Sequence, residues 1–197
     1  FQFINVFNQS RFNYNFKYSN SYFKFDLKNY ININIIPETS LIPMNKNFIL
    51  SGLNLAFLGF YSKGDIQITE NFYNWPDGIF AKIFDKKIKK IPGRDIVKNL
   101  KVPNNIKRIQ IIGNLSPKNY NYIKNKFKLA VSHHPLPYGP IEKLKNHLPK
   151  ISQDSLVFIT LPTPKQEQLS IELQRINSHY KIICIGASIS IASGEEK

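Results

Sequence analysis

Two short stretches of the chain contain side chains that could take part in catalysis or binding, one in a predicted turn and one at a predicted helix start. One is WPDG, in which Asp77 stands between Pro76 and Gly78. Pro-Asp-Gly is ordinary turn chemistry, so the stretch is consistent with a plain turn. It is also consistent with a carboxylate fixed at a strand end as a general base, which typically accelerates proton transfer about 10²–10⁴-fold.

The other stretch is PKQE, which begins at Pro164 and follows the apolar run LVFITL. Pro164 suits the first turn of a helix, and the carboxylate of Glu167 complements the positive end of the helix dipole. Neither reason accounts for Gln166, or for Lys165 at the helix end that disfavours a cation. We therefore interpret Lys165 and Gln166 as candidate ligand-binding residues.

Other motifs with chemical meaning are weak or missing from the sequence. His133 and His134 are adjacent, but no Cys or acidic residue accompanies them at metal-ligand spacing. The chain contains no Asp-x-Asp pair, no G-x-G-x-x-G, no P-loop and no G-x-S-x-G. Hydride transfer, P-loop chemistry and the α/β-hydrolase mechanism therefore lose support, and we expect neither a metal ion nor a cofactor.

The elements that must position these residues follow a regular pattern in the second half of the chain. The sequence predicts strands over 108–112, 128–132, 156–161 and 182–185, and helices over 117–127, 141–148 and 165–176. This alternation indicates an α/β, Rossmann-like fold with a mainly parallel sheet flanked by helices. Ser116 is the predicted N-cap of the first helix, and the apolar stripe of the last helix contains Leu169, Leu173 and Ile176.

The N-terminal portion is predicted to be smaller and β-rich. Strands are indicated over 30–36 and 48–53, and a short helix over 55–61. Residues 1–30 are dense in Asn, Phe, Tyr and Lys without a helical period, so we treat them as an irregular segment before an α/β domain of residues 31–197. Further on, Asp95 is suited to N-cap the stretch IVKNL.

Open parallel sheets bind ligands beyond the carboxyl ends of their strands. Small and polar residues follow the predicted strands at Gly113-Asn114, His133-His134, residues 162–167 and Gly186. The helices that begin after these strands offer free backbone amides to a phosphate. The sequence therefore predicts a ligand site along this edge of the sheet.

The composition indicates an anionic partner without choosing it. The formal net charge is +14 over 197 residues, which suits nucleic acid, an anionic membrane surface or a phosphorylated ligand. An AT-rich coding sequence would also produce a surface rich in Lys and Asn. The single cysteine, Cys184, lies in an apolar run and permits no disulfide within the chain, as in a reducing compartment. No apolar run reaches the ~20 residues of a membrane span.

Six motifs occur in an order that resembles one family. They are SGLN from Ser51, WPDG from Trp75, PGRD from Pro92, IIGN from Ile111, LPTPKQE from Leu161 and IGASISIASG from Ile185. From about Ile31 to its end, the chain resembles the WecG/TagA/CpsF glycosyltransferases of bacterial envelope and exopolysaccharide synthesis. PKQE after a strand is the most specific of these motifs.

The resemblance implies an inverting, metal-independent transfer of a sugar from a UDP-sugar to a lipid-linked, polyprenyl diphosphate saccharide acceptor. It implies a cytoplasmic enzyme at the inner face of the plasma membrane, in contact with anionic lipid, and leaves a homo-oligomer open. Asp77 is then the base that deprotonates the acceptor hydroxyl, and Gln166 contacts the nucleotide sugar. The implied substrate-binding residues are Ser51, Asn54, Lys90, Asp95, Gly113, Asn114, Lys165 and Gly186.

The sequence also departs from the family pattern. Gly52 stands where a Thr or Ser is common, Lys90 where an Arg is frequent, and Ser190 where an Asp is frequent. The membrane-associated tail of the family is expected to be absent from this chain, which ends at Lys197. Two alternatives stay open: a family member without activity that serves as a partner subunit, and a basic nucleic-acid-binding module. The second alternative has charge and 13% aromatic residues in its favour, but no RRM, KH or helix-turn-helix signature.

Overall fold

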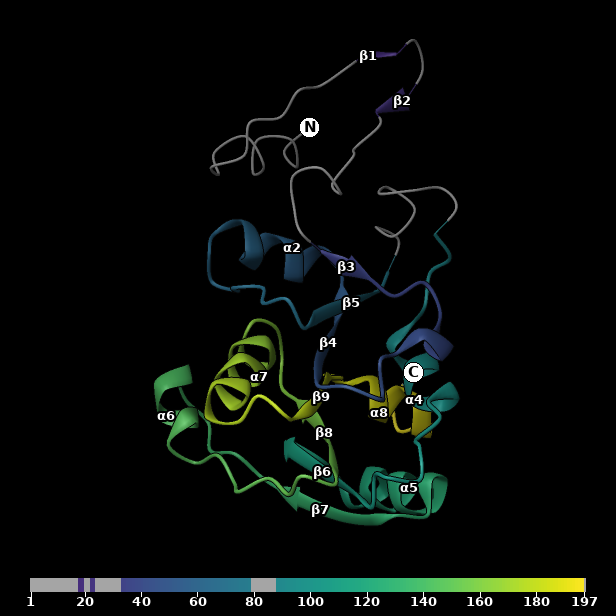
Figure 1. Ribbon diagram of the computed structural model, residues 1–197, viewed down its shortest axis with the longest axis vertical. Helices are drawn as coiled ribbons and strands as arrows, with labels where there is room; N and C mark the ends of the chain where they lie inside the picture. Colours follow the sequence, from purple (N-terminus) through teal and green to yellow (C-terminus); the bar gives the residue numbers. More distant parts are fainter. Residues whose placement is uncertain (1–17, 20–21, 24–32, 79–87, 197) are drawn as a thin grey trace.

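A computed structural model describes residues 18–19, 22–23, 33–78 and 88–196 (Figure 1). Its main feature is a seven-stranded sheet in the order β3-β5-β4-β9-β8-β6-β7, in which every neighbouring pair is parallel. The strands are β3 (Asn34–Ile35), β4 (Phe48–Leu53), β5 (Phe72–Pro76), β6 (Arg108–Gly113), β7 (Ala130–His134), β8 (Ser155–Thr160) and β9 (Lys181–Cys184). The predicted α/β, Rossmann-like fold is confirmed, and the sheet is wholly rather than mainly parallel.

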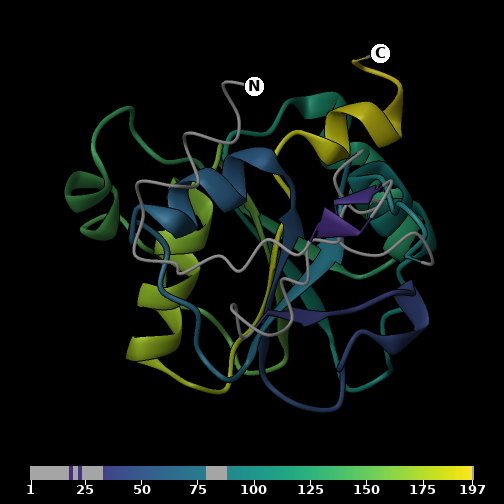
Figure 2. The same ribbon diagram turned by 90° about the horizontal axis from the view of Figure 1, so that it is seen from above.

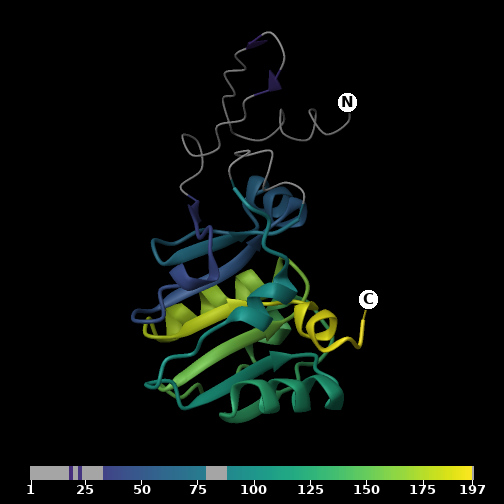
Figure 3. The ribbon, with the colours of Figure 1, turned by 90° about the vertical axis from the view of Figure 1, so that its right-hand side faces the viewer.

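Helices cover both faces of this sheet (Figures 2 and 3). One face packs against α2 (Leu55–Ser62), α6 (Ile141–Lys145) and α7 (Lys165–Ile176). The other packs against α4 (Gly93–Asn99), α5 (Pro117–Phe127) and α8 (Ser188–Ser193). A short 3-10 helix, η2 (Thr39–Leu41), precedes β4. The fold thus has three layers, with one hydrophobic core on each side of the sheet.

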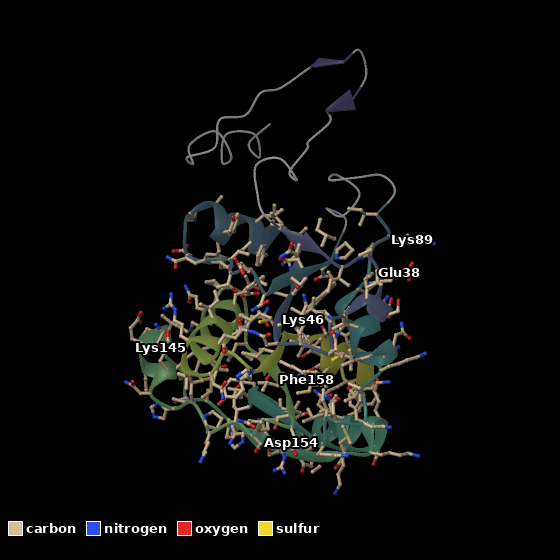
Figure 4. All side chains as sticks on the ribbon, viewed as in Figure 1. Glu38, Lys46, Lys89, Lys145, Asp154 and Phe158 are labelled. Atoms are coloured by element: carbon tan, nitrogen blue, oxygen red, sulfur yellow. The ribbon has the colours of Figure 1, made fainter. Side chains whose placement is uncertain are left out.

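The central strands show why the sequence lacks alternation here. All six residues of β8 are buried, with Leu156 and Phe158 in the core under α4, α5 and α8, and Val157 and Ile159 in the core under α7. Figure 4 shows Phe158 among the central side chains, whereas Lys145 and Asp154 are drawn nearer the periphery. A strand covered on both faces reads as a continuous apolar run, which is typical of parallel sheets.

The connections obey a single handedness. Those that step toward β3, namely β4 to β5, β7 to β8 and β8 to β9, pass through α2, α6 and α7 on one face. Those that step toward β7, namely β5 to β6 and β6 to β7, pass through α4 and α5 on the other face. These five crossovers therefore share one hand, in keeping with the strong preference for right-handed connections between parallel strands. Because every neighbouring pair is parallel, all seven carboxyl ends lie on the same edge of the sheet.

Local signals place several elements where the sequence predicts them. Helix α5 begins at Pro117, and the Ser116 hydroxyl caps it by accepting a hydrogen bond from the Asn119 amide at 3.2 Å. It ends at Lys128, which is left-handed with φ of 54°. Because Lys128 is used to terminate α5, β7 starts at Ala130 and not at residue 128 as predicted. The bounds predicted for α7 are correct at both ends.

Three other predictions need correction. Leu169 and Leu173 are buried as expected, but Ile176, the last residue of α7, is 65% exposed, because the helix ends beyond the edge of the core. The helix predicted over 141–148 ends at Lys145. Asp95 does not N-cap its helix: α4 starts at Gly93, directly after Pro92, and Asp95 lies within the first turn.

The N-terminal prediction is tested only in part. Residues Tyr18–Ser19 (β1) and Tyr22–Phe23 (β2) pair in antiparallel fashion, and most of the segment 1–30 lies outside the described residues. The strand predicted over 30–36 contains β3, which pairs with β5 in the main sheet. Within the ranges given above, no helix has the length and apolar character needed to cross a membrane.

Candidate functional site

The carboxyl ends of four adjacent strands, β5, β4, β9 and β8, bring four of the six motifs to one edge of the sheet. Ser51 of β4 is in register with Asn74 of β5 on one side and with Cys184 of β9 on the other. Gly52 is paired with Trp75 in the same way. SGLN, WPDG and the glycine turn after β9 therefore follow three adjacent strands, and PKQE follows β8, the next strand in the sheet.

Asp77 lies directly after β5, over the end of β4. The Asn54 side-chain amide donates to Asp77 Oδ2 at 3.4 Å, while its carbonyl oxygen caps α2 by accepting from the Phe57 amide at 3.0 Å. A Cβ on Gly52 would lie 3.2 Å from Asp77 Oδ2, so the carboxylate rests against the Gly52 backbone. Gly78 then turns the chain with a positive φ of 77°. The carboxylate is half-buried and fixed on one side.

The absence of a side chain at Gly52 has a local explanation. A Cβ there would also lie 3.2 Å from the ring edge of Trp75, closer than most real Cβ contacts. Asp77 and Trp75 together fill the space that the Thr or Ser of the resembling family would need. This departure from the family pattern is therefore coupled to the position of the candidate base.

The segment that contains PGRD returns to the same edge. The Ile91 amide donates to the Pro76 carbonyl at 2.8 Å, which brings Lys90 beside the turn that carries Asp77. A Cβ on Gly93 would overlap the Ser188 hydroxyl and approach the Trp75 ring to 3.7 Å. Glycine at position 93 thus permits close packing of the starts of α4 and α8 next to Trp75. The Lys90 side chain is exposed.

Gln166 makes three hydrogen bonds although it is buried. Its amide nitrogen donates to Thr163 Oγ1 at 3.2 Å and to Glu167 Oε1 at 2.9 Å. Its carbonyl oxygen accepts from the Gly186 amide at 3.0 Å. The residue that helix chemistry left unexplained in the sequence therefore joins the start of α7 to the turn between β9 and α8.

Glu167 was interpreted from the sequence only as a complement to the helix dipole, yet its side chain is fully buried. Its Oε1 atom accepts from the Ser51 hydroxyl at 2.7 Å and the Thr163 hydroxyl at 3.1 Å, in addition to Gln166. Burial raises the pKa of this carboxyl, against the opposing effect of the hydrogen bonds from Ser51, Gln166 and Thr163. A sequence signal for this burial was present. The apolar stripe that contains Leu169, continued by one turn toward the N-terminus, predicts that the start of α7 lies against the sheet.

Cys184 faces the same group from β9. It is fully buried, and burial together with the nearby Glu167 carboxyl raises the pKa of its thiol well above the ordinary value. The thiol also donates to the main-chain carbonyl oxygen of Gln166 at 3.5 Å. It therefore packs as a core residue, in agreement with the interpretation from the sequence.

Other predicted site residues have contacts of their own. Lys165 Nζ donates to the Gly139 carbonyl at 2.8 Å, so this lysine holds the loop between β7 and α6. Gly113 ends β6 with φ of 116°, and its carbonyl accepts from His133 Nε2 at 2.8 Å. Gly113 and the exposed Asn114 are separated from β4 by β8 and β9. The Asp95 carboxylate faces Arg94 at 3.8 Å on the surface of α4.

The last described residues dock on the start of α5. The buried Asn119 amide donates to the Ser190 hydroxyl at 2.8 Å and also to the Glu195 carboxylate, which accepts from the Ser116 hydroxyl at 2.7 Å. Ser190 is thus part of a structural network that joins α8 to the start of α5. Sequence reasoning did not identify Asn119.

In the part of the chain that the structure describes, no three His, Cys, Asp or Glu side chains gather where they could hold a metal ion. A comparison with protein-family models finds no match to this chain, and a comparison with curated proteins finds none either.

Proposed function

We propose that the protein is an inverting, metal-independent glycosyltransferase that moves a sugar from a UDP-sugar to a lipid-linked saccharide acceptor at a membrane surface. The observation that carries this proposal is the position of Asp77, held by Asn54 over Gly52 at the edge where parallel α/β sheets bind ligands. One Asp77 oxygen receives the Asn54 amide, and the carboxylate retains acceptor capacity for a hydroxyl proton.

The mechanism needs a base on one face of the sugar and positive charge near the leaving diphosphate on the other. Asp77 is the proposed base. Lys90 is brought beside the Asp77 turn through the Ile91–Pro76 hydrogen bond, and its exposed ammonium is available to an anionic ligand. Lys165 is less suited to this role because its ammonium is engaged by the Gly139 carbonyl.

In this proposal, Gln166 and Gly186 shape the donor site from the opposite side of β4. Gln166 is buried with both types of its polar atoms engaged, so its contribution is to hold the turn at Gly186. Ser51 reaches the same group through Glu167. Two neighbouring residues of β4, Ser51 and Gly52, thus connect the Gln166 contacts with Asp77.

The proposal is tested first by binding and then by turnover. UDP and a panel of UDP-hexoses, UDP-N-acetylhexosamines and UDP-uronic acids are titrated against the protein, and binding is read as a rise in melting temperature. Donors that bind are then assayed for sugar transfer to a polyprenyl diphosphate saccharide mimic. Stabilisation by UDP with transfer to the acceptor supports the enzyme.

Two other results would replace the proposal. Oligonucleotide binding with a steep salt dependence and no response to UDP would favour the basic nucleic-acid-binding module, for which the net charge of +14 is the supporting observation. Binding of UDP without transfer to any acceptor in the panel would favour an inactive relative that serves as a partner subunit.

A further inference from the structure

The Glu167 carboxyl is fully buried, accepts hydrogen bonds from three side chains, and has no task in the proposed mechanism. We propose that Glu167 is a positioning residue: its Oε1 atom fixes the orientation of the Gln166 amide, and through it the Gly186 turn that enters α8. That this turn belongs to a donor site rests on the proposed function; the positioning itself does not.

Three donors converge on one carboxyl oxygen of Glu167. The Ser51 hydroxyl comes from β4 at 2.7 Å, the Thr163 hydroxyl from the loop after β8 at 3.1 Å, and the Gln166 amide from α7 at 2.9 Å. A helix-dipole role needs none of these contacts and no burial, since acidic residues in first turns are commonly exposed. Complete burial with three donors instead indicates a group that holds its neighbours.

These contacts determine which way the Gln166 amide faces. Its nitrogen donates to Glu167 and Thr163, so its carbonyl oxygen is turned toward the Gly186 amide, which it accepts at 3.0 Å. The reversed amide would place N–H groups against the Gly186 N–H and a carbonyl against the Glu167 carboxyl. Without Glu167, the amide nitrogen keeps only the Thr163 hydroxyl, which can donate or accept, and the Gly186 amide is the one remaining partner that favours a single orientation.

The orientation of the Gln166 amide affects other residues at the carboxyl edge of the sheet. Gly186 adopts a positive φ of 52° and leads into α8, and Ser188 at the start of α8 packs against Gly93. Gly93 follows the segment that pairs with Pro76, next to Asp77. A displaced Gly186 turn would therefore shift the packing that places Lys90 beside the candidate base.

The test compares Glu167→Ala, Glu167→Gln, Gln166→Ala and the double variant Gln166→Ala/Glu167→Ala. Hydrogen exchange of the Gly186 amide, measured by NMR, reports the contact to Gln166 without any ligand. The Gly186 amide keeps a second acceptor, the Ile159 carbonyl at 3.2 Å, when the Gln166 contact is lost. We therefore expect a several-fold rise in its exchange rate and not complete loss of protection. Ser170→Ala is the matched control, because it removes a buried hydrogen bond to the Glu167 main-chain carbonyl and leaves both side chains in place.

If Glu167 acts through Gln166, Glu167→Ala raises Gly186 exchange as much as Gln166→Ala does, and the double variant raises it no further. Glu167→Gln stays near wild type, because its amide oxygen still accepts from Gln166. Ser170→Ala lowers the melting temperature without a selective change at Gly186. Unchanged Gly186 exchange in Glu167→Ala, or effects that multiply in the double variant, would overturn the proposal.

Two provisions keep the outcomes separate. If Glu167→Ala does not fold, Glu167→Leu is used, which fills the same space but removes the acceptor of the Gln166 amide; unchanged Gly186 exchange in that variant contradicts the proposal. The UDP dissociation constant is measured in parallel, with about tenfold weakening expected in Gln166→Ala and Glu167→Ala but not in Glu167→Gln. A wild-type protein that does not bind UDP refutes the proposed function, while the exchange rates still decide the role of Glu167.

Discussion

The side-chain amide of Asn54 lies 3.4 Å from Asp77 Oδ2, although 23 residues separate them in the sequence. The same amide group caps α2 through its carbonyl oxygen. A helix start and a strand end are thereby joined at the carboxyl edge of the sheet. This relationship orients the Asp77 carboxylate, as the general base of the proposed mechanism requires.

Replacement of Asp77 by Asn is expected to lower the turnover number at least ~100-fold, because the amide cannot accept the acceptor proton as a base. The fold and the UDP dissociation constant should change little, since the replacement is nearly isosteric. Steady-state kinetics, the melting temperature and a UDP titration check this. Asp65→Asn, a change at an exposed carboxylate, is the control and should retain full activity. Undiminished turnover in Asp77→Asn removes the residue from the mechanism.

The packing of Gly52 against Asp77 and Trp75 predicts opposite effects for the same substitution at two glycines. Gly52→Ala places a methyl group 3.2 Å from both neighbours and should lower the free energy of unfolding by about 1–3 kcal/mol. Gly59→Ala, in α2 with nothing within 4 Å of the new Cβ, should raise it by about 0.5–1 kcal/mol. Urea unfolding measures both. Equal effects would show that Gly52 is not closely packed.

The buried Glu167 carboxyl predicts a pH-dependent stability. Burial raises its pKa in the folded state, so the stability it contributes is present below the unfolded value of about 4.3 and is lost as the pH rises through the folded value. Glu167→Gln cannot lose this proton. The free energy of unfolding of the wild type should therefore fall relative to Glu167→Gln as the pH increases from about 4.

Urea midpoints of the two proteins, measured at a series of pH values, isolate this effect because all other groups are shared. The titratable group that Glu167 faces from β9 is Cys184, whose pKa is raised well above its ordinary value by burial and by Glu167. Its thiol stays neutral across the acidic part of the series. Parallel pH profiles for wild type and Glu167→Gln would contradict the predicted role of burial.

Much of the fold follows from local signals, whereas the site depends on strand order. Ser116 and Pro117 determine where α5 starts, and the apolar run before Pro164 indicates β8 and then α7. Nothing local specifies that β9 inserts between β4 and β8. That insertion brings Gly186 to Gln166 and leaves two strands, β9 and β8, between β4 and the strand that ends at Gly113. The strand order is determined by pairing between segments that are distant in the sequence. The hydrophobic periodicity within one segment carries no information about that pairing.

The burial of Glu167 was missed for a related reason. The first turn of a helix is usually at the surface, where a carboxylate complements the dipole. Here β4 offers Ser51 on the sheet face under α7, and the contact spans 116 residues. The exposure of Ile176 has the opposite cause, since α7 continues past the strands it covers.

The enclosed position of Cys184 predicts a slow thiol. Its side chain is 1% exposed, and both burial and the Glu167 carboxyl disfavour the thiolate, which is the reactive form. Modification by a thiol reagent should be at least about a hundredfold slower in the folded protein than in urea. Stopped-flow absorbance with a disulfide reagent measures both rates. Rapid, stoichiometric labelling of the native protein would contradict the packing around Glu167.

The most direct measurement is a titration of isotope-labelled protein with UDP, followed through backbone amide shifts. A ligand at the carboxyl edge should perturb Gly52, Asp77 and Gly186 first, and leave Lys107 and Asp154, which precede β6 and β8 at the amino edge, unchanged. Saturating changes at the first set are the predicted result. Changes confined to the amino edge, or no change at any UDP concentration, would contradict the assignment of a sugar-nucleotide site.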